Sequence, residues 1–137
     1  NVVLGYPDTV PVTMDEMIML TAAVRRGVKN AMVIGDMPFM SYNVSIPEAI
    51  ANAGRFMKEA GVSAVKLEGG GPMVDVVKAL TQAGIPVVGH LGLTPQSAGM
   101  LGGYKVQGKT AQNAAIMLDE ALRLQTAGAL MLVLEIF

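Results

Sequence analysis

The sequence predicts an α/β fold, and more specifically roughly the central half of a (β/α)8 TIM barrel. Three observations favour this fold. Four short apolar runs alternate with helical patterns, a glycine follows each of three predicted helices, and an ionisable residue stands at the end of every apolar run. Because a complete barrel needs about 250 residues, we expect residues 1–137 to form a single partial barrel domain that lacks the first and last βα units.

Four apolar runs are the predicted strands. They are AMVIG (31–35), AVKLE (64–68), PVVGH (86–90) and ALMLVLE (129–135). Short, mostly uninterrupted apolar runs are typical of buried parallel strands covered by helices. Right-handed crossovers between successive βα units place the strands side by side in a parallel sheet.

The first two helices carry recognisable start signals. Thr13 with Glu16 forms a predicted capping box that opens a helix ending near Arg26. Ser45 with Glu48 opens the next helical segment in the same way, with a proline just inside its start.

Two further helices follow the same plan and end in the same way. They are expected in PMVDVVKALTQAG (72–84) and TAQNAAIMLDEALRLQTAG (110–128), the second capped by Thr110. The sequences EAGV, QAGI and TAGA each place a glycine after a helix and an apolar run just beyond it. Glycine adopts the left-handed conformation that ends a helix, so a short loop then leads into the next strand.

Ionisable residues mark the ends of the four predicted strands. Asp36 follows the first strand, while Glu68, His90 and Glu135 end the other three. Lys66 stands two residues before Glu68, and residues two apart on a strand face the same side. A doubly wound sheet also fits this length, but ionisable groups at the carboxyl ends of successive strands are typical of a barrel active site.

Each of these residues also has a structural interpretation. Lys66 and Glu68 could form a buried ion pair, although such pairs rarely stabilise a fold. Asp36 could cap a turn; together with Glu68 it could instead bind a divalent ion such as Mg²⁺, which is commonly held by one or two carboxylates. His90 could be structural, and Glu135 could face solvent. Burial of Glu135 would raise its pKa, a property useful in a general base.

The composition excludes several classes of function. Hydrophobic residues make up 52% and charged residues 15%, which argues against disorder. The absence of cysteine excludes thiolate chemistry, and a single histidine is too few for a multi-histidine zinc site. A net charge of -1 without a basic cluster argues against binding to nucleic acid. No apolar run reaches the roughly 18 residues of a membrane span, and we expect a cytoplasmic enzyme. The glycine-rich segments 69–72 and 101–109 match no P-loop or dinucleotide fingerprint.

Several ordered motifs together resemble one known family. DMPFMSY (36–42), AVKLEGG (64–70), GHLGLTPQS (89–97) and GGYKVQG (102–108) are similar to ketopantoate hydroxymethyltransferase, and LGYPDTVPVT (4–13) and ALMLVLE (129–135) fit the same family. The resemblance covers essentially the whole chain. It departs at the start, because family members carry an earlier strand ending in GDSLG whose aspartate and serine complete the site.

The resemblance implies a barrel of the phosphoenolpyruvate/pyruvate type that assembles as a homodecamer. The reaction it implies transfers a hydroxymethyl group from 5,10-methylenetetrahydrofolate to 3-methyl-2-oxobutanoate (α-ketoisovalerate). The product is 2-dehydropantoate (ketopantoate), in pantothenate and coenzyme A biosynthesis, by way of a Mg²⁺-stabilised enolate. Two alternatives remain open at this point: a related Mg²⁺-enolate barrel lyase or mutase, and a barrel remnant without catalytic activity.

Residue roles follow from the resemblance, motif by motif. Asp36 would bind both Mg²⁺ and substrate, and Glu68 would be the second metal-site carboxylate. Lys66 would contact the keto acid. Glu135 would be the proton acceptor at C3 of the substrate, and His90 would support the site.

Overall fold

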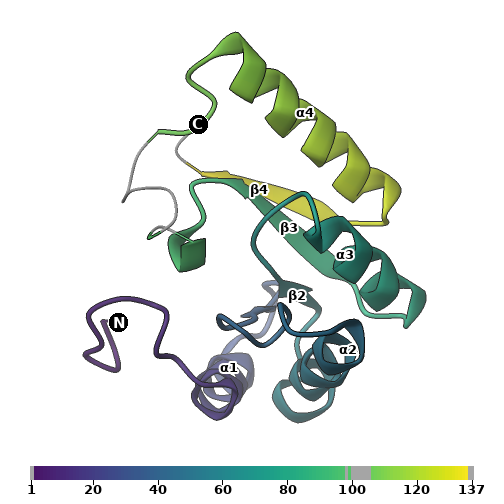
Figure 1. Ribbon diagram of the computed structural model, residues 1–137. Coiled ribbons are helices and arrows are strands. Elements are labelled where there is room, and N and C mark those ends of the chain that lie inside the picture. Colours follow the sequence, from purple (N-terminus) through teal and green to yellow (C-terminus); the bar gives the residue numbers. More distant parts are fainter. Residues whose placement is uncertain (1, 98, 100–105, 136–137) are drawn as a thin grey trace.

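The computed structural model describes residues 2–97, 99 and 106–135 (Figure 1). Its elements are, in chain order, α1 (Met14–Gly27), β1 (Ile34–Asp36), α2 (Ile46–Arg55), the π-helical turn η1 (Phe56–Ala60), β2 (Ala64–Lys66), α3 (Met73–Gln82), β3 (Val87–Gly92), the 3₁₀ turn η2 (Pro95–Ser97), α4 (Ala111–Thr126) and β4 (Met131–Glu135). The strands form one parallel sheet in the order β1-β2-β3-β4. The predicted α/β class is confirmed, and this sequential order is consistent with a partial barrel.

All four predicted strands form, but their bounds differ from the prediction. β1 starts at Ile34 and includes Asp36, and β2 ends at Lys66, so that Glu68 lies just beyond it. β3 continues to Gly92, so His90 lies within the strand and does not end it as predicted. Pairing with β4, which runs to Glu135 opposite Gly92, extends β3 past the apolar run.

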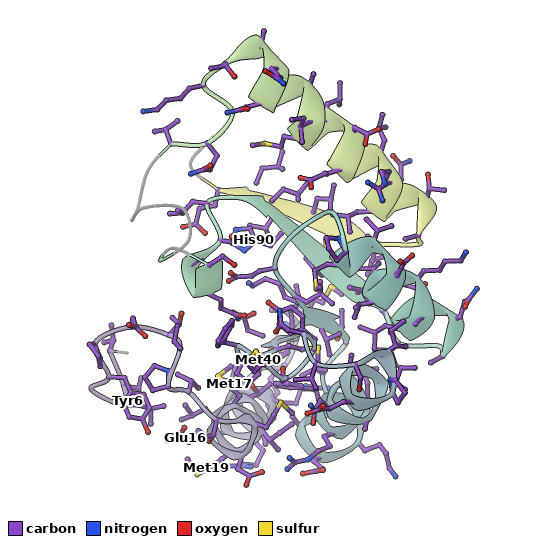
Figure 2. The ribbon with its side chains drawn as sticks, viewed as in Figure 1. Tyr6, Glu16, Met17, Met19, Met40 and His90 are labelled. Atoms are coloured by element: carbon purple, nitrogen blue, oxygen red, sulfur yellow. The ribbon has the colours of Figure 1, made fainter. Side chains whose placement is uncertain are left out.

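The predicted capping box at the start of α1 is confirmed. The Thr13 hydroxyl accepts a hydrogen bond from the Glu16 backbone N–H, and Glu16 Oε2 accepts one from the Thr13 backbone N–H at 2.8 Å. Figure 2 shows Tyr6 beside this helix; its hydroxyl donates to Glu16 Oε1 at 2.6 Å. Hydrogen bonds from Tyr6 and Thr13 lower the pKa of Glu16. This network fixes the N-terminal segment against α1.

The other predicted caps and stops also form. Ser45 and Thr110 accept hydrogen bonds from backbone N–H groups in the first turns of α2 and α4. Gly61, Gly84 and Gly128 follow three helices with φ of +67°, +82° and +99°. Such positive φ values strain residues with a Cβ, which explains the repeated glycine. Each turn then leads the chain back to the sheet.

The hydrophobic core lies between the sheet and the helices. In Figure 1 the helices form an arc along one side of the sheet. Val65 and Leu67 of the β2 segment face this side and are fully buried, as are Phe56 of η1 and Leu80 of α3. Because side chains alternate along a strand, Lys66, which lies between Val65 and Leu67, faces the other side.

β4 departs from the expectation of a buried strand. Met131, Val133 and Leu134 are all exposed. Within the described residues β4 pairs with β3 alone, so one of its edges pairs with no strand. An apolar strand that is exposed in this way suits a position where further barrel units would pack.

Gly35 at the centre of β1 offers a direct test of the packing. A Cβ at this position would overlap the ring of the fully buried Phe56. Overpacking of this kind typically costs about 1–3 kcal/mol. We therefore expect Gly35→Ala to lower the free energy of unfolding by about 1–3 kcal/mol, measured by urea denaturation followed by circular dichroism.

A second glycine supplies the control for this test. A Cβ at Gly54 in α2 would meet no neighbouring atom. Replacing a helix-interior glycine by alanine stabilises by about 0.5–1 kcal/mol, so Gly54→Ala should raise stability. Equal effects of Gly35→Ala and Gly54→Ala would contradict the packing of Phe56 against β1.

No helix within residues 2–97, 99 and 106–135 is both long and apolar enough to cross a membrane.

Candidate active site

Five ionisable side chains predicted from the sequence lie on one face of the sheet, towards the carboxyl ends of the strands. Asp36 and Lys66 are paired neighbours on β1 and β2. Glu68 follows two residues after Lys66 and therefore faces the same side. His90 on β3 pairs with Val133 of β4, two residues before Glu135. The parallel register thus brings together residues from four separate segments.

Lys66 lies at the centre of this cluster. Its Nζ is 3.0 Å from Asp36 Oδ1 and 3.3 Å from Glu68 Oε1. The same Nζ is 3.3 Å from His90 Nδ1. The Lys66 side chain is 16% exposed and that of Glu68 only 4%, so these charges interact with little screening from water. The predicted pairing of Lys66 with Glu68 is present, and Asp36 joins it.

One carboxylate oxygen of Asp36 is buried, while the rest of the side chain is accessible to solvent. Its side chain is 46% exposed, yet Oδ1 is buried and makes no hydrogen bond of suitable geometry, although Lys66 Nζ is near. Burial raises the pKa of Asp36, and the positive charge of Lys66 partly opposes this shift. Asp36 Oδ1 is therefore paired with Lys66, and the exposed part of the side chain is open to a further positively charged partner.

His90 lies on β3 (Figure 2), and each of its ring nitrogens is near a carboxylate. Its Nδ1 is 3.8 Å from Glu68 Oε1, and its Nε2 is 3.3 Å from Glu135 Oε2. Burial, and next the positive charge of Lys66, lower the pKa of His90. The imidazole is therefore neutral near pH 7 and can donate one hydrogen bond and accept another.

Glu135 ends β4 as predicted, but the chain does not bury it. Its side chain is 43% exposed. Of the two alternatives left open for Glu135, burial and exposure to solvent, the structure shows the exposed one. Gly92 lies opposite Glu135, and its φ of +95° lets the Leu93 N–H donate to the Glu135 carbonyl at 2.7 Å. This backbone contact fixes Glu135 relative to His90.

Two residues of the site were not identified from the sequence as functional. Tyr42 donates a hydrogen bond to Gln96 Oε1 at 2.7 Å, and the Gln96 backbone N–H donates to Glu68 Oε2 at 3.0 Å. Both residues stand in the motifs DMPFMSY and GHLGLTPQS. Those motifs were the only available signal, since neither residue type is ionised at neutral pH or placed at a strand end.

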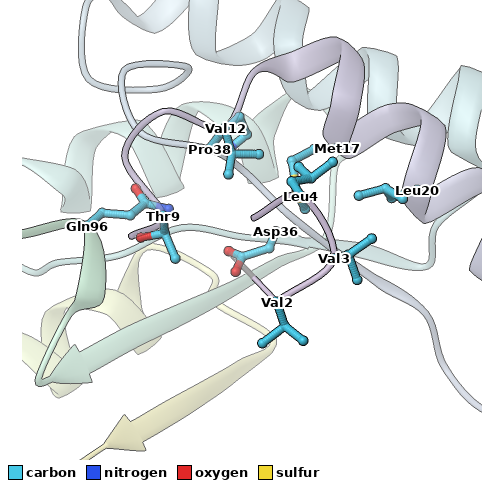
Figure 3. Close-up of a pocket in the computed structure, with 10 residues that line it drawn as sticks. All are labelled: Val2, Val3, Leu4, Thr9, Val12, Met17, Leu20, Asp36, Pro38 and Gln96. Atoms are coloured by element: carbon cyan, nitrogen blue, oxygen red, sulfur yellow. The ribbon is translucent and has the colours of Figure 1, made fainter. Parts of the chain in front are cut away.

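A cavity of about 300 Å³ opens beside Asp36 (Figure 3). Its walls come from the N-terminal segment, α1 and the loops after β1 and β3. The lining residues are Val2, Val3, Leu4, Thr9, Val12, Met17, Leu20, Asp36, Pro38 and Gln96. The cavity is thus mostly apolar, and its polar side chains are the carboxylate of Asp36, the amide of Gln96 and the hydroxyl of Thr9.

The glycine-rich segments have different outcomes. The segment 69–72 forms the loop between β2 and α3, as predicted, with positive φ at Gly69 and Gly71. The segment 101–109 lies outside the described residues as far as position 105, so its predicted loop conformation is described only from 106 onwards.

The carboxylates fit a hard divalent cation. Within the described part of the chain, no three histidine or acidic side chains converge on a common point that could hold a metal. Mg²⁺, however, is commonly bound by only one or two carboxylates, with water and substrate oxygens completing the octahedron. Asp36 and Glu68 supply two, and the exposed part of the Asp36 side chain is open to a cation.

The family model described as "Ketopantoate hydroxymethyltransferase" matches residues 1–137, the full length of the chain. The chain belongs to this family. All five clustered residues lie inside the match to the ketopantoate hydroxymethyltransferase family, as do Tyr42 and Gln96.

Curated relatives agree with this membership. A "3-methyl-2-oxobutanoate hydroxymethyltransferase" from Geobacillus kaustophilus is 60% identical over 134 residues, which is 98% of this chain and 48% of the relative. Proteins of the same name from Carboxydothermus hydrogenoformans and Heliobacterium modesticaldum are 60% and 58% identical, with 98% of this chain and 49% of each relative covered. The chain therefore spans about half the length of the ketopantoate hydroxymethyltransferase relatives it matches.

Proposed function

We propose that this chain supplies the central part of the active site of a 3-methyl-2-oxobutanoate hydroxymethyltransferase. The main observation behind this proposal is the cluster in which Lys66 Nζ contacts both Asp36 and Glu68. His90 lies between this ion pair and Glu135. Family membership and the name of the relatives support the reaction. The proposal includes a cytoplasmic, homodecameric enzyme of pantothenate and coenzyme A biosynthesis.

The proposed reaction joins one carbon to a branched keto acid. The C3–H bond of 3-methyl-2-oxobutanoate breaks, and the C3 electron pair forms a bond to the methylene carbon of 5,10-methylenetetrahydrofolate. Water supplies the hydroxyl group, and tetrahydrofolate leaves. The product is ketopantoate. A base, a positive charge near the keto acid and an apolar space for its isopropyl group are therefore needed.

Asp36 and Glu68 would hold Mg²⁺. Bound there, the ion would act as a Lewis acid on the keto carbonyl and favour loss of the C3 proton. Two carboxylates leave room for the carbonyl and carboxylate oxygens of the keto acid. Lys66 would pair with the substrate carboxylate, because its ammonium is the only positive side chain of the cluster if His90 is neutral.

Glu135 would accept the C3 proton. Its carboxylate is accessible and lies 3.3 Å from His90 Nε2, a buried nitrogen without a hydrogen-bond partner among the described residues. A neutral His90 could donate a hydrogen bond from Nε2 to Glu135 and so restrain the orientation of its carboxylate. Because it carries no charge, it would not compete with Lys66 for the substrate carboxylate. The apolar cavity beside Asp36 has room for the branched alkyl end of the keto acid.

The test uses a protein of full family length. We place the 134 matched residues of this chain in the corresponding part of the Geobacillus kaustophilus relative and call the result the completed protein. Ketopantoate formation from 3-methyl-2-oxobutanoate and 5,10-methylenetetrahydrofolate is followed with Mg²⁺ and then with EDTA. Metal-dependent product supports the proposal. A folded completed protein that forms no product, with the unmodified relative active under the same conditions, would refute it.

Substrate comparison separates this proposal from related chemistry. Oxaloacetate-like and isocitrate-like acids are offered without folate, since a lyase acting through an enolate would cleave them. Turnover of these acids, together with no dependence on folate, would favour the lyase or mutase alternative instead.

A further inference from the structure

A closed ring of hydrogen bonds begins and ends at Glu68. The Glu68 backbone N–H donates to the Tyr42 hydroxyl at 3.2 Å, and that hydroxyl donates to Gln96 Oε1 at 2.7 Å. The Gln96 backbone N–H donates to Glu68 Oε2 at 3.0 Å. Tyr42 and Glu68 are buried, so the ring is largely shielded from water. Hydrogen bonds in such surroundings are strong and expensive to leave unmade.

The chemistry of the partners fixes the orientation of the Gln96 amide. Its Nε2 donates to the Met37 carbonyl at 2.9 Å, and a carbonyl can only accept. Burial raises the pKa of Tyr42, so its hydroxyl keeps its proton. That oxygen already accepts from Glu68, so its proton is available for Gln96 Oε1. A flipped amide would set two carbonyl oxygens against each other.

Gln96 also joins three loops at the carboxyl ends of the strands. Met37 and Tyr42 belong to the segment after β1, Glu68 follows β2, and Gln96 itself stands in η2 after β3. Tyr42 and Glu68 are 26 residues apart in the sequence, and Met37 and Gln96 are 59 residues apart. The side chain of Gln96 thus binds the segment after β1, and its backbone N–H binds Glu68.

We propose that Gln96 is a positioning residue that fixes the Glu68 carboxylate. Glu68 Oε2 accepts from the Gln96 backbone N–H, which leaves Oε1 directed at Lys66 at 3.3 Å. The Gln96 side chain holds this N–H in place through its bonds to Tyr42 and Met37. Rotation of the carboxylate would remove Oε1 from the site where substrate and cation are expected. The consequence for catalysis rests on the proposed function; the restraint on Glu68 does not. Gln96 itself acts through Glu68 and Tyr42.

Two variants open the ring at different points. Gln96→Leu removes the side-chain bonds to Tyr42 and Met37 at nearly constant size, and Tyr42→Phe removes a single hydroxyl. In the completed protein, each should weaken Mn²⁺ binding, measured by electron paramagnetic resonance of the free ion, by about 10- to 100-fold, as is usual when a residue behind a metal ligand is lost. Mn²⁺ binding by the double variant should be little weaker than that by either single variant, because both substitutions break the same ring of hydrogen bonds.

A second readout needs no metal. Deuterium exchange of the peptide covering residues 64–71, followed by mass spectrometry, reports on the Glu68 N–H. We expect faster exchange in both variants, because the hydroxyl that accepts this N–H is either removed or released from Gln96. Gln125→Leu, at an exposed position near the end of α4, is the matched control and should change neither readout.

The outcomes separate this proposal from the proposed function. Weaker Mn²⁺ binding together with faster exchange supports the positioning role. Variants that only lower the unfolding temperature, with Mn²⁺ affinity and exchange unchanged, would overturn it. A completed protein that binds no Mn²⁺ at all counts against the proposed metal site. In that case the positioning role of Gln96 is decided by deuterium exchange alone. Faster exchange in both variants supports the restraint on Glu68, and unchanged exchange refutes it.

Discussion

Replacing Glu135 by glutamine is expected to remove proton abstraction from C3 of 3-methyl-2-oxobutanoate. Glutamine keeps the size and hydrogen-bonding reach of the side chain but cannot accept a proton as a carboxylate does. General bases typically contribute about 100- to 10,000-fold to a rate. We therefore expect the exchange of the C3 proton for deuterium, followed by NMR in D₂O, to fall by about 100- to 10,000-fold in the completed protein.

The design of this measurement separates chemistry from binding. Folate is left out, so that only loss of the C3 proton is observed, and parallel samples contain Mg²⁺ or EDTA. Mn²⁺ binding to the Glu135→Gln variant should be unchanged, since the proposed metal-site carboxylates are Asp36 and Glu68. Glu48→Gln, at an exposed position in the first turn of α2, is the control and should exchange at the parent rate.

Two results would contradict the role given to Glu135. One is full exchange in the Glu135→Gln variant, which would assign the proton to another base. The other is loss of Mn²⁺ binding with exchange retained. If the parent shows no exchange, the experiment is repeated with folate present, because folate could be needed to organise the site. Neither exchange nor ketopantoate under those conditions would favour a barrel segment without catalytic activity.

Replacing Lys66 by methionine is expected to destabilise the protein and to abolish activity. Methionine keeps much of the apolar stem but leaves the carboxylates of Asp36 and Glu68 without their shared ammonium. Removing one partner of a buried ion pair costs about 3–5 kcal/mol. Because the Asp36 side chain is 46% exposed, we expect the lower end, about 3 kcal/mol, measured by urea denaturation of the completed protein without metal.

Added Mg²⁺ should restore part of this loss. A cation that binds the native state alone stabilises it, and the variant has two carboxylates without an ammonium between them. The Mg²⁺-dependent rise in unfolding temperature should therefore be larger for Lys66→Met than for the parent, while activity stays lost because the keto acid has no positive side chain to pair with. Lys78→Met, at an exposed position on α3, is the control. An equal effect of Mg²⁺ on parent and variant would argue against metal binding by these carboxylates.

Local sequence patterns predicted the four α-helices and the glycines that stop them, but not the π-helical turn η1 that continues α2. The capping box of Thr13 and Glu16 acts within one turn, and Gly61, Gly84 and Gly128 adopt left-handed φ at positions that the sequence marks. These features depend on neighbours a few residues away, so the sequence contains all the information they need. The alternation of apolar runs with helices likewise predicted the parallel sheet.

The candidate site was predictable in part, for a related reason. In a parallel sheet, residues at the carboxyl ends of successive strands meet at one edge. The positions of Asp36, Glu68 and Glu135 relative to their apolar runs were therefore enough to bring them together. The pairing of Lys66 with Glu68 followed from the two-residue period of a strand.

Only the tertiary structure decided the remaining features. Strand pairing extended β3 beyond His90, and the exposure of β4 left Glu135 accessible. Tyr42 and Gln96 contact Glu68 across 26 and 28 residues of sequence. No local pattern encodes such contacts, because they depend on how separate loops approach one another after the sheet has formed. The sequence by itself determined the elements and the edge where the chemistry is expected; packing between distant segments determined how its side chains are held.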